Sequence, residues 1–407
     1  MKKITVKSTV EVASSDTEAI VWGGYQIPFI RYAGGVLYVK FMGRRDCVET
    51  IGLEDLDPVY ASYDGGLSWK KSDLSAWRRA AMLIPNGDRI DFVERENTCG
   101  SFQLPPPKKE GASGGDSNVA VYSIDEISHI VKGVEKTFTL SRLKSGETDP
   151  IEEICKVNWE DMPVSCYFKN DGVLIRNINP EQCDFKVDKN GILWLPVYGN
   201  AVASENESLS SAFFSTHLLR SDDMGHTWDY VSTVYYDPEL NEKDAYSVEG
   251  FNEATVEILD NGDIILIIRS GSLHPFKQNG RPIPKMFIVR SSDEGKTWTK
   301  PQPFYDYGIH PHSYKTQDGT ILMISGRPGV YLRMCDAEGK NWSEITEIVH
   351  VPQEDVMTKY FEYTCSNADM CICDDGRVFV TYSKFFQDIE NGTHKKSIMV
   401  SEICLED

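Results

Sequence analysis

The sequence has no apolar run long enough to cross a membrane, and its first residues contain no apolar core of a signal peptide. These two absences predict a soluble protein that stays in the cytoplasm. Basic residues are also in the minority, with 42 Lys and Arg against 62 Asp and Glu, which gives a net charge of -20. Because an acidic chain repels phosphate, we expect neither nucleic acid nor a membrane surface as a partner.

The cysteines lack the spacing of a metal site or a redox motif. None of the ten forms a Cys-x-x-Cys pair, and Cys371 and Cys373 fit two small apolar residues on one strand face. We therefore expect buried, reduced thiols and neither a metal nor a cofactor. Helix signals are equally scarce, and residues 124–129 form at most a short turn.

The sequence is rich, by contrast, in hairpin signals. Turn residues such as Asn-Gly and Asp-Gly, which favour β-hairpins, stand between apolar stretches at six places. The hairpin glycines are Gly35, Gly87, Gly191, Gly262, Gly319 and Gly376. Most neighbouring glycines in this set are roughly fifty to seventy residues apart. The gap between Gly87 and Gly191 is the exception, at about twice the shortest spacing. Repeats of this length predict four strands each.

Four-stranded repeats of this length predict an all-β fold, a six-bladed β-propeller in a single domain over residues 1–407. A seventh blade in the long gap is the alternative. We favour one extended blade, because residues 104–116 are rich in Pro and Gly and fit a loop, with outer strands near residues 136–140 and 153–157. The last hairpin lacks a fourth strand, so residues 4–8 are expected to close the ring beside the C-terminal strand.

An octet with the pattern Ser-x-Asp-x-Gly-x-Thr-Trp marks the outer turns of the repeats. It occurs at residues 221–228 and 291–298, and with Ser in place of Thr at residues 62–69, while residues 335–342 keep its Gly and Trp. We expect the Asp to bind backbone amides of the turn, the Gly to adopt a positive φ and the Trp to pack between sheets. These roles are structural.

Two sets of polar residues are expected to meet at the end of the hairpins opposite the turns, since strand ends pair in an antiparallel hairpin. Counting back from the hairpin glycines gives Gln26, Arg78, Gln182, Glu253, His310 and Asn367, and counting forward gives Arg44, Arg95, Asn200, Arg269, Arg327 and Lys384. Polar residues are common in wet propeller channels. Five of the six residues counted forward are nevertheless cationic, and a concave site with this much positive charge in an acidic protein favours an anionic ligand. Guanidinium groups pair well with a carboxylate.

The octets resemble the Asp-box of the sialidase superfamily, and the resemblance covers nearly the whole chain. In that family the octets lie in peripheral turns, and three arginines bind the carboxylate of the sugar. Arg269 resembles the second of these arginines and Arg327 the third. Gln26 stands where the first is expected, and Arg78 could supply the missing cation.

The resemblance also implies an acid, a base and a tyrosine nucleophile. Glu253 resembles the glutamate that acts as base for the tyrosine, and the acid should come from the loop after Arg44. Asn367 stands at the tyrosine's position. The nearest candidates for the acid are Asp46 and Glu49. The nearest candidates for the tyrosine are Tyr363 and Tyr360.

The leading hypothesis is an exo-acting glycosidase that removes a terminal acidic sugar from a glycan, with sialic acid as the first guess. One alternative is a uronate-directed glycosidase or lyase in which His310 is the base. His312 could form a proton-transfer pair with it, but His312 is expected to face away from the channel if side chains alternate along the strand. Another is a propeller that binds acidic glycans without catalysis, which Asn367 at the nucleophile position would fit. All three predict an acidic carbohydrate as the partner.

Overall fold

The computed structural model describes residues 2–15, 24–43, 57–93, 97–106, 109–113, 116–178, 180, 185–202, 213–237, 240, 250–270, 286–305, 308–351, 367–389 and 393–406. This part of the chain is all-β, as predicted, apart from the short helices α1 (Leu74–Arg79) and α2 (Ile124–Ile127). Neither helix has the length or the apolar character needed to cross a membrane.

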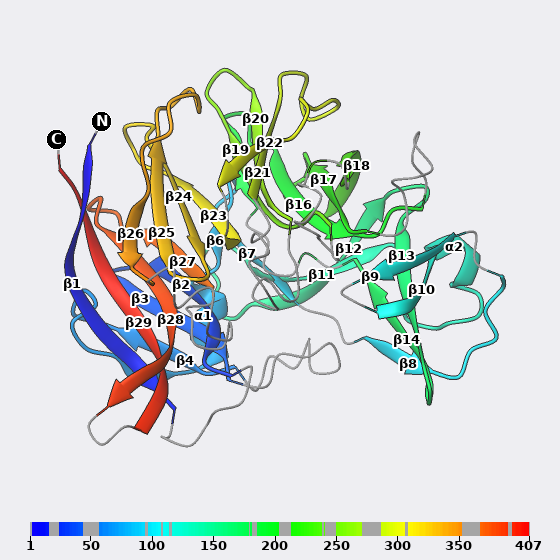
Figure 1. Ribbon diagram of the computed structural model, residues 1–407, viewed down its shortest axis with the longest axis horizontal. Helices are drawn as coiled ribbons and strands as arrows, with labels where there is room; N and C mark the ends of the chain where they lie inside the picture. Colours follow the sequence, from blue (N-terminus) through cyan, green and yellow to red (C-terminus); the bar gives the residue numbers. More distant parts are fainter. Residues whose placement is uncertain are drawn as a thin grey trace.

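Three sheets are four-stranded meanders that follow the chain, as the hairpin signals predicted (Figure 1). They consist of β2 (Gln26–Ala33), β3 (Val36–Met42), β4 (Val59–Ser62) and β5 (Lys70–Ser72); of β19 (Asn252–Ile258), β20 (Ile264–Arg269), β21 (Met286–Ser291) and β22 (Gln302–Tyr305); and of β23 (Ile309–Lys315), β24 (Ile321–Gly326), β25 (Val330–Cys335) and β26 (Thr346–Val349).

A fourth four-stranded sheet joins the two ends of the chain. It contains β27 (Ala368–Ile372), β28 (Val378–Ile389), β29 (Thr393–Glu406) and β1 (Lys3–Ser14). Strand β1 is antiparallel to β29, with Ile4 opposite Leu405. The prediction that the N-terminal strand completes the last sheet is therefore confirmed, and the two strands lie side by side at the left of Figure 1.

An eight-stranded sheet combines two further four-stranded units. The first has β6 (Met82–Leu83), β7 (Arg89–Val93), β11 (Thr137–Leu143) and β12 (Ile151–Asn158), and the second has β15 (Lys186–Val187), β16 (Leu193–Gly199), β17 (Ser215–Ser221) and β18 (Thr227–Val234). The units are joined by parallel pairing of β12 with β18. Strands β11 and β12 confirm the outer strands predicted near residues 136–140 and 153–157.

A separate five-stranded sheet fills the long gap in the repeat. It consists of β8 (Thr98–Gly100), β9 (Lys109–Ser113), β10 (Asp116–Ser123), β13 (Pro163–Lys169) and β14 (Gly172–Asn177), and it lies at the right of Figure 1. The prediction of a loop over residues 104–116 was thus partly wrong. Residues 109–113 form an edge strand that pairs with β10. The Gly and nearby Pro that suggested a loop are tolerated there, because the outer side of an edge strand forms no ladder hydrogen bonds.

The inner strands of neighbouring sheets lie against one another in the order β16, β19, β23, β27 and β2, which is the arrangement that a propeller requires. Their apolar faces form part of the core, with Val256 of β19 and Met370 of β27 fully buried. The number of blades stays a prediction.

The octet turns have the structural roles that the sequence predicted. The side chain of Asp293 accepts hydrogen bonds from the Thr297 backbone N–H (2.9 Å) and hydroxyl (2.6 Å), and Gly295 has a φ of 78°. Gly295 also packs closely on the preceding sheet, since a Cβ there would lie 2.5 Å from Leu218 Cδ2. The octet thus joins consecutive sheets.

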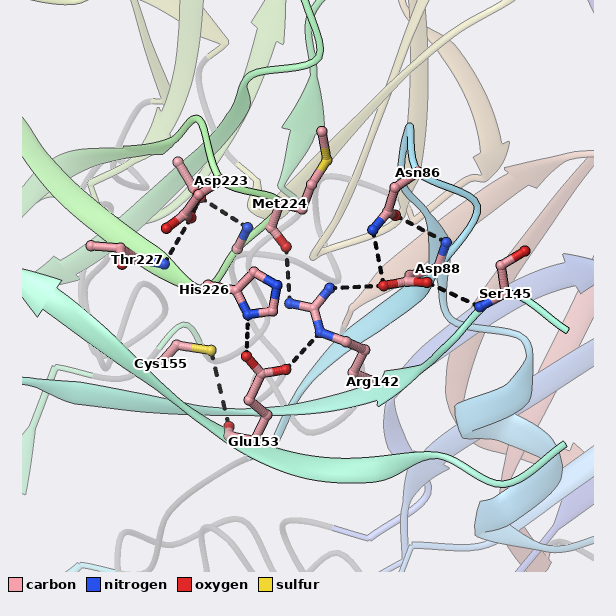
Figure 2. Close-up of polar contacts among 12 residues, drawn as sticks. Asn86, Asp88, Arg142, Ser145, Glu153, Cys155, Asp223, Met224, His226 and Thr227 are labelled. Carbon is pink, nitrogen blue, oxygen red and sulfur yellow. Dashed lines mark hydrogen bonds and ion pairs between the residues drawn. The ribbon is translucent and has the colours of Figure 1, made fainter. Parts of the chain in front are cut away.

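A buried arginine reinforces one of these joints (Figure 2). Arg142 of β11 is fully buried and donates hydrogen bonds to Glu153 (2.7 Å) and to the carbonyl of Met224 (2.9 Å) in the octet turn of the next unit. Its Nη1 also lies 3.3 Å from Asp88 in the hairpin turn of its own unit, and Glu153 contacts His226 of the octet. The unit without an octet of its own is therefore tied to its neighbour by charge.

Candidate active site

Three inner strands are bulged at the end opposite their hairpin turns. The bulges fall between Gln26 and Phe29 in β2, between Asn252 and Ala254 in β19, and between Ile309 and His312 in β23. A bulge breaks the regular alternation of side chains and often re-aims a residue at a functional site. The common level of the three bulges marks this end of the sheets as the candidate site.

Glu253 lies within the bulge of β19 and uses both carboxylate oxygens. Oε1 accepts a hydrogen bond from Nη1 of Arg269 (2.7 Å), and Oε2 accepts one from the backbone N–H of His310 (2.9 Å). The side chains of Glu253 and Arg269 are only 12% and 11% exposed. Strands β19, β20 and β23 are therefore fixed to one another at this point.

The positive charges around Glu253 decide its protonation state. Burial is the largest influence and raises the pKa of Glu253, but Arg269, His310 and Arg327 together outweigh it, so that the pKa lies below its ordinary value. Glu253 is therefore ionised at neutral pH. Glu253 and Arg269 are in direct contact, and Arg327 is close enough to lower the pKa of Glu253.

The backbone is strained at the same end of the sheets. His310 and Arg327 have φ angles of 52° and 50°, and Tyr25 and Ile27 have φ angles of 53° and 50°. In the described part of the chain, every other non-glycine residue with a positive φ lies in an octet turn. Such conformations cost about 1–3 kcal/mol each and persist where the surroundings enforce them, which is typical of functional sites.

His310 and His312 form a buried pair. Nδ1 of His310 lies 2.8 Å from Nε2 of His312, and each residue is 1% exposed. The ring of Phe29 makes edge contacts with both imidazoles, and its centroid lies 5.8 Å from that of His310 and 6.0 Å from that of His312. The expectation that His312 faces away from His310 was wrong, because the bulge between Ile309 and His312 breaks the alternation on which it depended.

Asp369 of β27 continues the chain of contacts. Its Oδ1 lies 3.8 Å from Nδ1 of His312 and accepts hydrogen bonds from the hydroxyl of Tyr314 (2.8 Å) and the backbone N–H of Met370 (2.8 Å). Its Oδ2 accepts the backbone N–H of Ile30 (2.9 Å). These donors fix a buried carboxylate beside the histidine pair.

A cavity of about 470 Å³ adjoins this chain of contacts. It is lined by Phe29 and Asp369 and continues past Arg31, whose guanidinium pairs with Asp91 (2.6 Å) and stacks over Trp77 at 3.9 Å. Glu253 and Arg269 do not line it. His310 and His312 do not line it either, and the chain of contacts from Glu253 reaches the cavity wall at Asp369 and Phe29.

Other predicted site residues lie in or directly beside strands β2, β16, β27 and β28. Gln26 begins β2 and is 1% exposed, Asn367 directly precedes β27 and is buried, and Lys384 lies in β28. Asn200 follows β16 and accepts a hydrogen bond from the hydroxyl of Ser165 (2.8 Å).

Arg78 corrects one expectation, because it lies in α1 and not on an inner strand. It is 3.4 Å from Glu152 of β12. The count from Gly87 fails because β6 has only two residues and a helix precedes it. Seven further candidates lie outside the described residues: Arg44, Asp46, Glu49, Arg95, Gln182, Tyr360 and Tyr363.

Sequence reasoning missed Asp369 and Phe29. A signal for Asp369 was present, since it is the only charged residue in the apolar strand at residues 368–372. Nothing in the sequence pointed to Phe29. Among the described residues, no three His, Cys, Asp or Glu side chains are grouped in a way that could hold a metal ion.

Comparison with known families places this site in context. The BNR repeat-like domain family matches residues 172–393, which is more than half of the 407-residue chain. The chain therefore belongs to the BNR repeat-like domain family, which confirms the superfamily that the octets suggested. A comparison with curated proteins found no match.

Solved structures show similarity over nearly the whole chain. A protein of unknown function from Dyadobacter fermentans DSM 18053 has 18% identity over 99% of both chains and a TM-score of 0.59, so it shares the fold. A mutant of the NanB sialidase from Streptococcus pneumoniae has 14% identity over 97% of this chain and 70% of that one, with a TM-score of 0.45. An alpha-L-arabinanase from Penicillium chrysogenum has 14% identity over 97% and 98%, with a TM-score of 0.45.

Proposed function

We propose that the protein is a glycosidase that removes a terminal acidic sugar from a glycan, with sialic acid as the first candidate. The observation that carries the proposal is the cluster of Arg269, Arg327 and ionised Glu253 at the bulged ends of the inner strands. Two guanidinium groups and one carboxylate leave a net positive charge. A nearly buried positive site in a protein of net charge -20 favours an anionic ligand.

Arg269 and Arg327 would hold the carboxylate of the sugar by charge-assisted hydrogen bonds. Glu253 keeps Arg269 in place and, in the mechanism that the sialidase resemblance implies, assists a tyrosine nucleophile. The remaining roles fall to residues outside the described part: Asp46 or Glu49 as the acid that protonates the leaving oxygen, and Tyr360 or Tyr363 as the nucleophile.

A second candidate is a uronate-directed glycosidase or lyase with His310 as the base. The contact between His310 and His312 favours it, because paired imidazoles suit proton transfer. The two candidates share the arginine site and the acidic sugar. They differ in product, since elimination leaves an unsaturated uronate that absorbs ultraviolet light.

The test compares umbelliferyl glycosides of sialic acid, glucuronic acid and galactose. We expect turnover of an acidic glycoside and none of galactoside. Arg269→Ala should lower kcat/KM by roughly 10- to 100-fold, the effect of losing one charge-assisted hydrogen bond. Arg220→Ala, an arginine on the outward part of β17, is the matched control and should keep the wild-type rate.

Undiminished turnover in Arg269→Ala would refute the assigned site. Tight binding of free sialic acid or glucuronic acid with no turnover of either glycoside would instead support the non-catalytic glycan-binding alternative. Formation of an unsaturated product from a uronate-containing oligosaccharide would favour the second candidate over the first.

A further inference from the structure

The cavity of about 470 Å³ has no part in the proposed function, because Glu253 and Arg269 do not line it. We propose that it is a second binding site, which takes a small carboxylate with an apolar ring and holds the acid group at Lys40. The inference does not depend on the sugar proposed for Arg269. The volume lies within the range of roughly 300–1,000 Å³ that is usual for small-molecule sites.

The cavity lies where one inner strand is short. Strand β6 has two residues, and they pair with residues 89 and 90 of β7. Residues 91–93 continue β7 beyond the end of β6, and all three line the cavity. Helix α1 precedes β6 and brings Trp77 to the wall. The open space therefore follows from the length of β6.

Most of the wall is apolar. Phe29 of β2 and Phe92 of β7 line the cavity and are half-buried, and Phe185, which precedes β15, is buried beside them. A ligand that covers apolar side chains gains about 25 cal/mol per Å² of surface removed from water. Aromatic side chains also pack well against flat rings. The body of the ligand should therefore be an apolar ring.

The wall has four cations among the described residues, and three of them are already engaged. Arg31 donates to both oxygens of Asp91, at 2.9 and 2.6 Å. Arg89 and Lys315 each donate a hydrogen bond to a backbone carbonyl, at 2.7 and 2.8 Å. The fourth cation is Lys40.

Lys40 of β3 is half-buried, and within the described part of the chain its ammonium has no hydrogen bond and no ion pair. It lies over the ring of Trp77, with Nζ 5.7 Å from the centroid, and Arg31 stacks over the same ring at 3.9 Å. A charge that is partly removed from water without an anion is unfavourable. A ligand carboxylate would supply that anion through charge-assisted hydrogen bonds.

The carboxylates of the wall do not favour a cationic ligand instead. Burial raises the pKa of Asp91, but three neighbouring cations outweigh it, so that the pKa lies below its ordinary value and Asp91 stays ionised on Arg31. Asp57, Asp369 and Asp374 have partners of their own. A cation would compete with these partners, whereas an anion would find an ammonium that has none.

The test titrates phenylacetate and phenylacetamide into the full chain and measures each Kd by calorimetry. The two probes share a ring and differ in charge, so phenylacetate should bind about ten-fold more tightly or better. Lys40→Met removes the ammonium and keeps an unbranched side chain. It should weaken phenylacetate roughly 10- to 100-fold, the effect of losing one charge-assisted hydrogen bond, and leave phenylacetamide within a few-fold.

Two matched variants complete the titration. Lys71→Met, at an exposed position of β5 in the same sheet, should bind both probes like the wild type. Lys40→Arg keeps the charge and should keep the affinity for phenylacetate within a few-fold. Equal binding of the two probes, no detectable binding of phenylacetate, or undiminished binding in Lys40→Met would overturn the inference.

Arg269→Ala separates this site from the one in the proposed function. Phenylacetate should bind to it as to the wild type, and a loss of binding would place the probe at the arginine cluster and refute the second site. If phenylacetate binds at Lys40 in a protein that turns over no acidic glycoside, the second site stands and the proposed function alone fails.

A spectroscopic measurement on the wild-type chain needs no weakened variant. In protein labelled with carbon-13 at the lysine side chains, the signal of Lys40 is the one absent from Lys40→Arg. Phenylacetate should shift this signal and leave the signal of Lys71 in place. A Lys40 signal that does not move at saturating phenylacetate would contradict the proposed contact.

Discussion

Nη1 of Arg269 lies 2.7 Å from Oε1 of Glu253, and the other oxygen of the same carboxylate accepts the backbone N–H of His310. One buried carboxylate therefore holds both the arginine proposed to bind the sugar and the strand that carries the proposed base. The distance between these two functions is fixed by hydrogen bonds among three strands. This arrangement makes Glu253 the most informative single position to change.

Replacement of Glu253 by Gln should separate binding from turnover. The change removes a negative charge beside Arg269 and Arg327, so the affinity for a free acidic sugar should rise a few-fold. The kcat should fall about ten-fold, because the anchor of His310 is weakened. Calorimetric titration and steady-state kinetics measure the two effects.

Glu257→Gln is the matched control, since Glu257 is also buried in β19. Burial raises the pKa of Glu257, although Lys186 and Lys315, the latter 4.0 Å away, act against it. The control should leave affinity unchanged. An equal effect in both variants would show that the sugar responds only to net charge.

The stability of the protein should fall as the pH drops below about 6.5. Burial lowers the pKa of His217 to about 3, and its nitrogens contact Thr233 and the carbonyl of Gly199. In the unfolded chain His217 has an ordinary histidine pKa of about 6.5, so it takes up a proton there as the pH falls, whereas in the folded chain it stays neutral down to about pH 3. This costs about 2 kcal/mol by pH 5.

Urea unfolding at pH 7 and pH 5 measures this loss. His217→Gln should be less stable at pH 7 but should show a smaller difference between the two pH values. His350→Gln, at an exposed position, should keep the wild-type difference. An unchanged pH dependence in His217→Gln would assign the loss to other groups.

Arg142→Met should destabilise the protein by about 3 kcal/mol. The change leaves Glu153 and Asp88 without the fully buried cation that they share, and breaking a buried ion pair costs about 3–5 kcal/mol. We take the lower end because the two carboxylates are 25% and 14% exposed. Urea unfolding gives the value, and Arg377→Met, which removes an arginine whose side chain is 40% exposed, should cost far less.

Cysteine reactivity should follow burial. Burial raises the pKa of the thiols of Cys155, Cys166 and Cys335 to about 12, whereas Cys99 is exposed. Iodoacetamide at pH 8 should therefore modify Cys99 in the native protein and the three buried thiols only after unfolding. Peptide mass spectrometry identifies the sites. Equal labelling of Cys99 and Cys155 in the native state would contradict the buried core.

Local turn chemistry explains why the hairpins could be predicted. Gly262 has a φ of 90°, a conformation that glycine adopts readily and other residues avoid, so the Asn-Gly pair marks the turn between β19 and β20. The same reasoning located the inner hairpins of the other four-stranded units and the octet turns, but not the five-stranded sheet. Nearby residues alone determine these features.

The bulges could not be predicted, because they depend on distant partners. The shift in β23 between Ile309 and His312 is defined only against β24, and it brings His310 to Glu253 of another sheet. Asp369 likewise joins the site through donors from β2 and β23. The candidate residues were thus identifiable by type and position, whereas the contacts between them required the folded chain.

The pairing of β1 with β29 has a consequence for synthesis on the ribosome. Lys3 lies opposite Glu406, so β1 finds its partner β29 only after all the strands between them in the sequence have been made. Until then β1 keeps an unsatisfied edge, and the loop that must be closed is nearly as long as the chain itself. This sheet therefore closes late in synthesis. A translation product truncated before β29 would leave β1 without its partner strand.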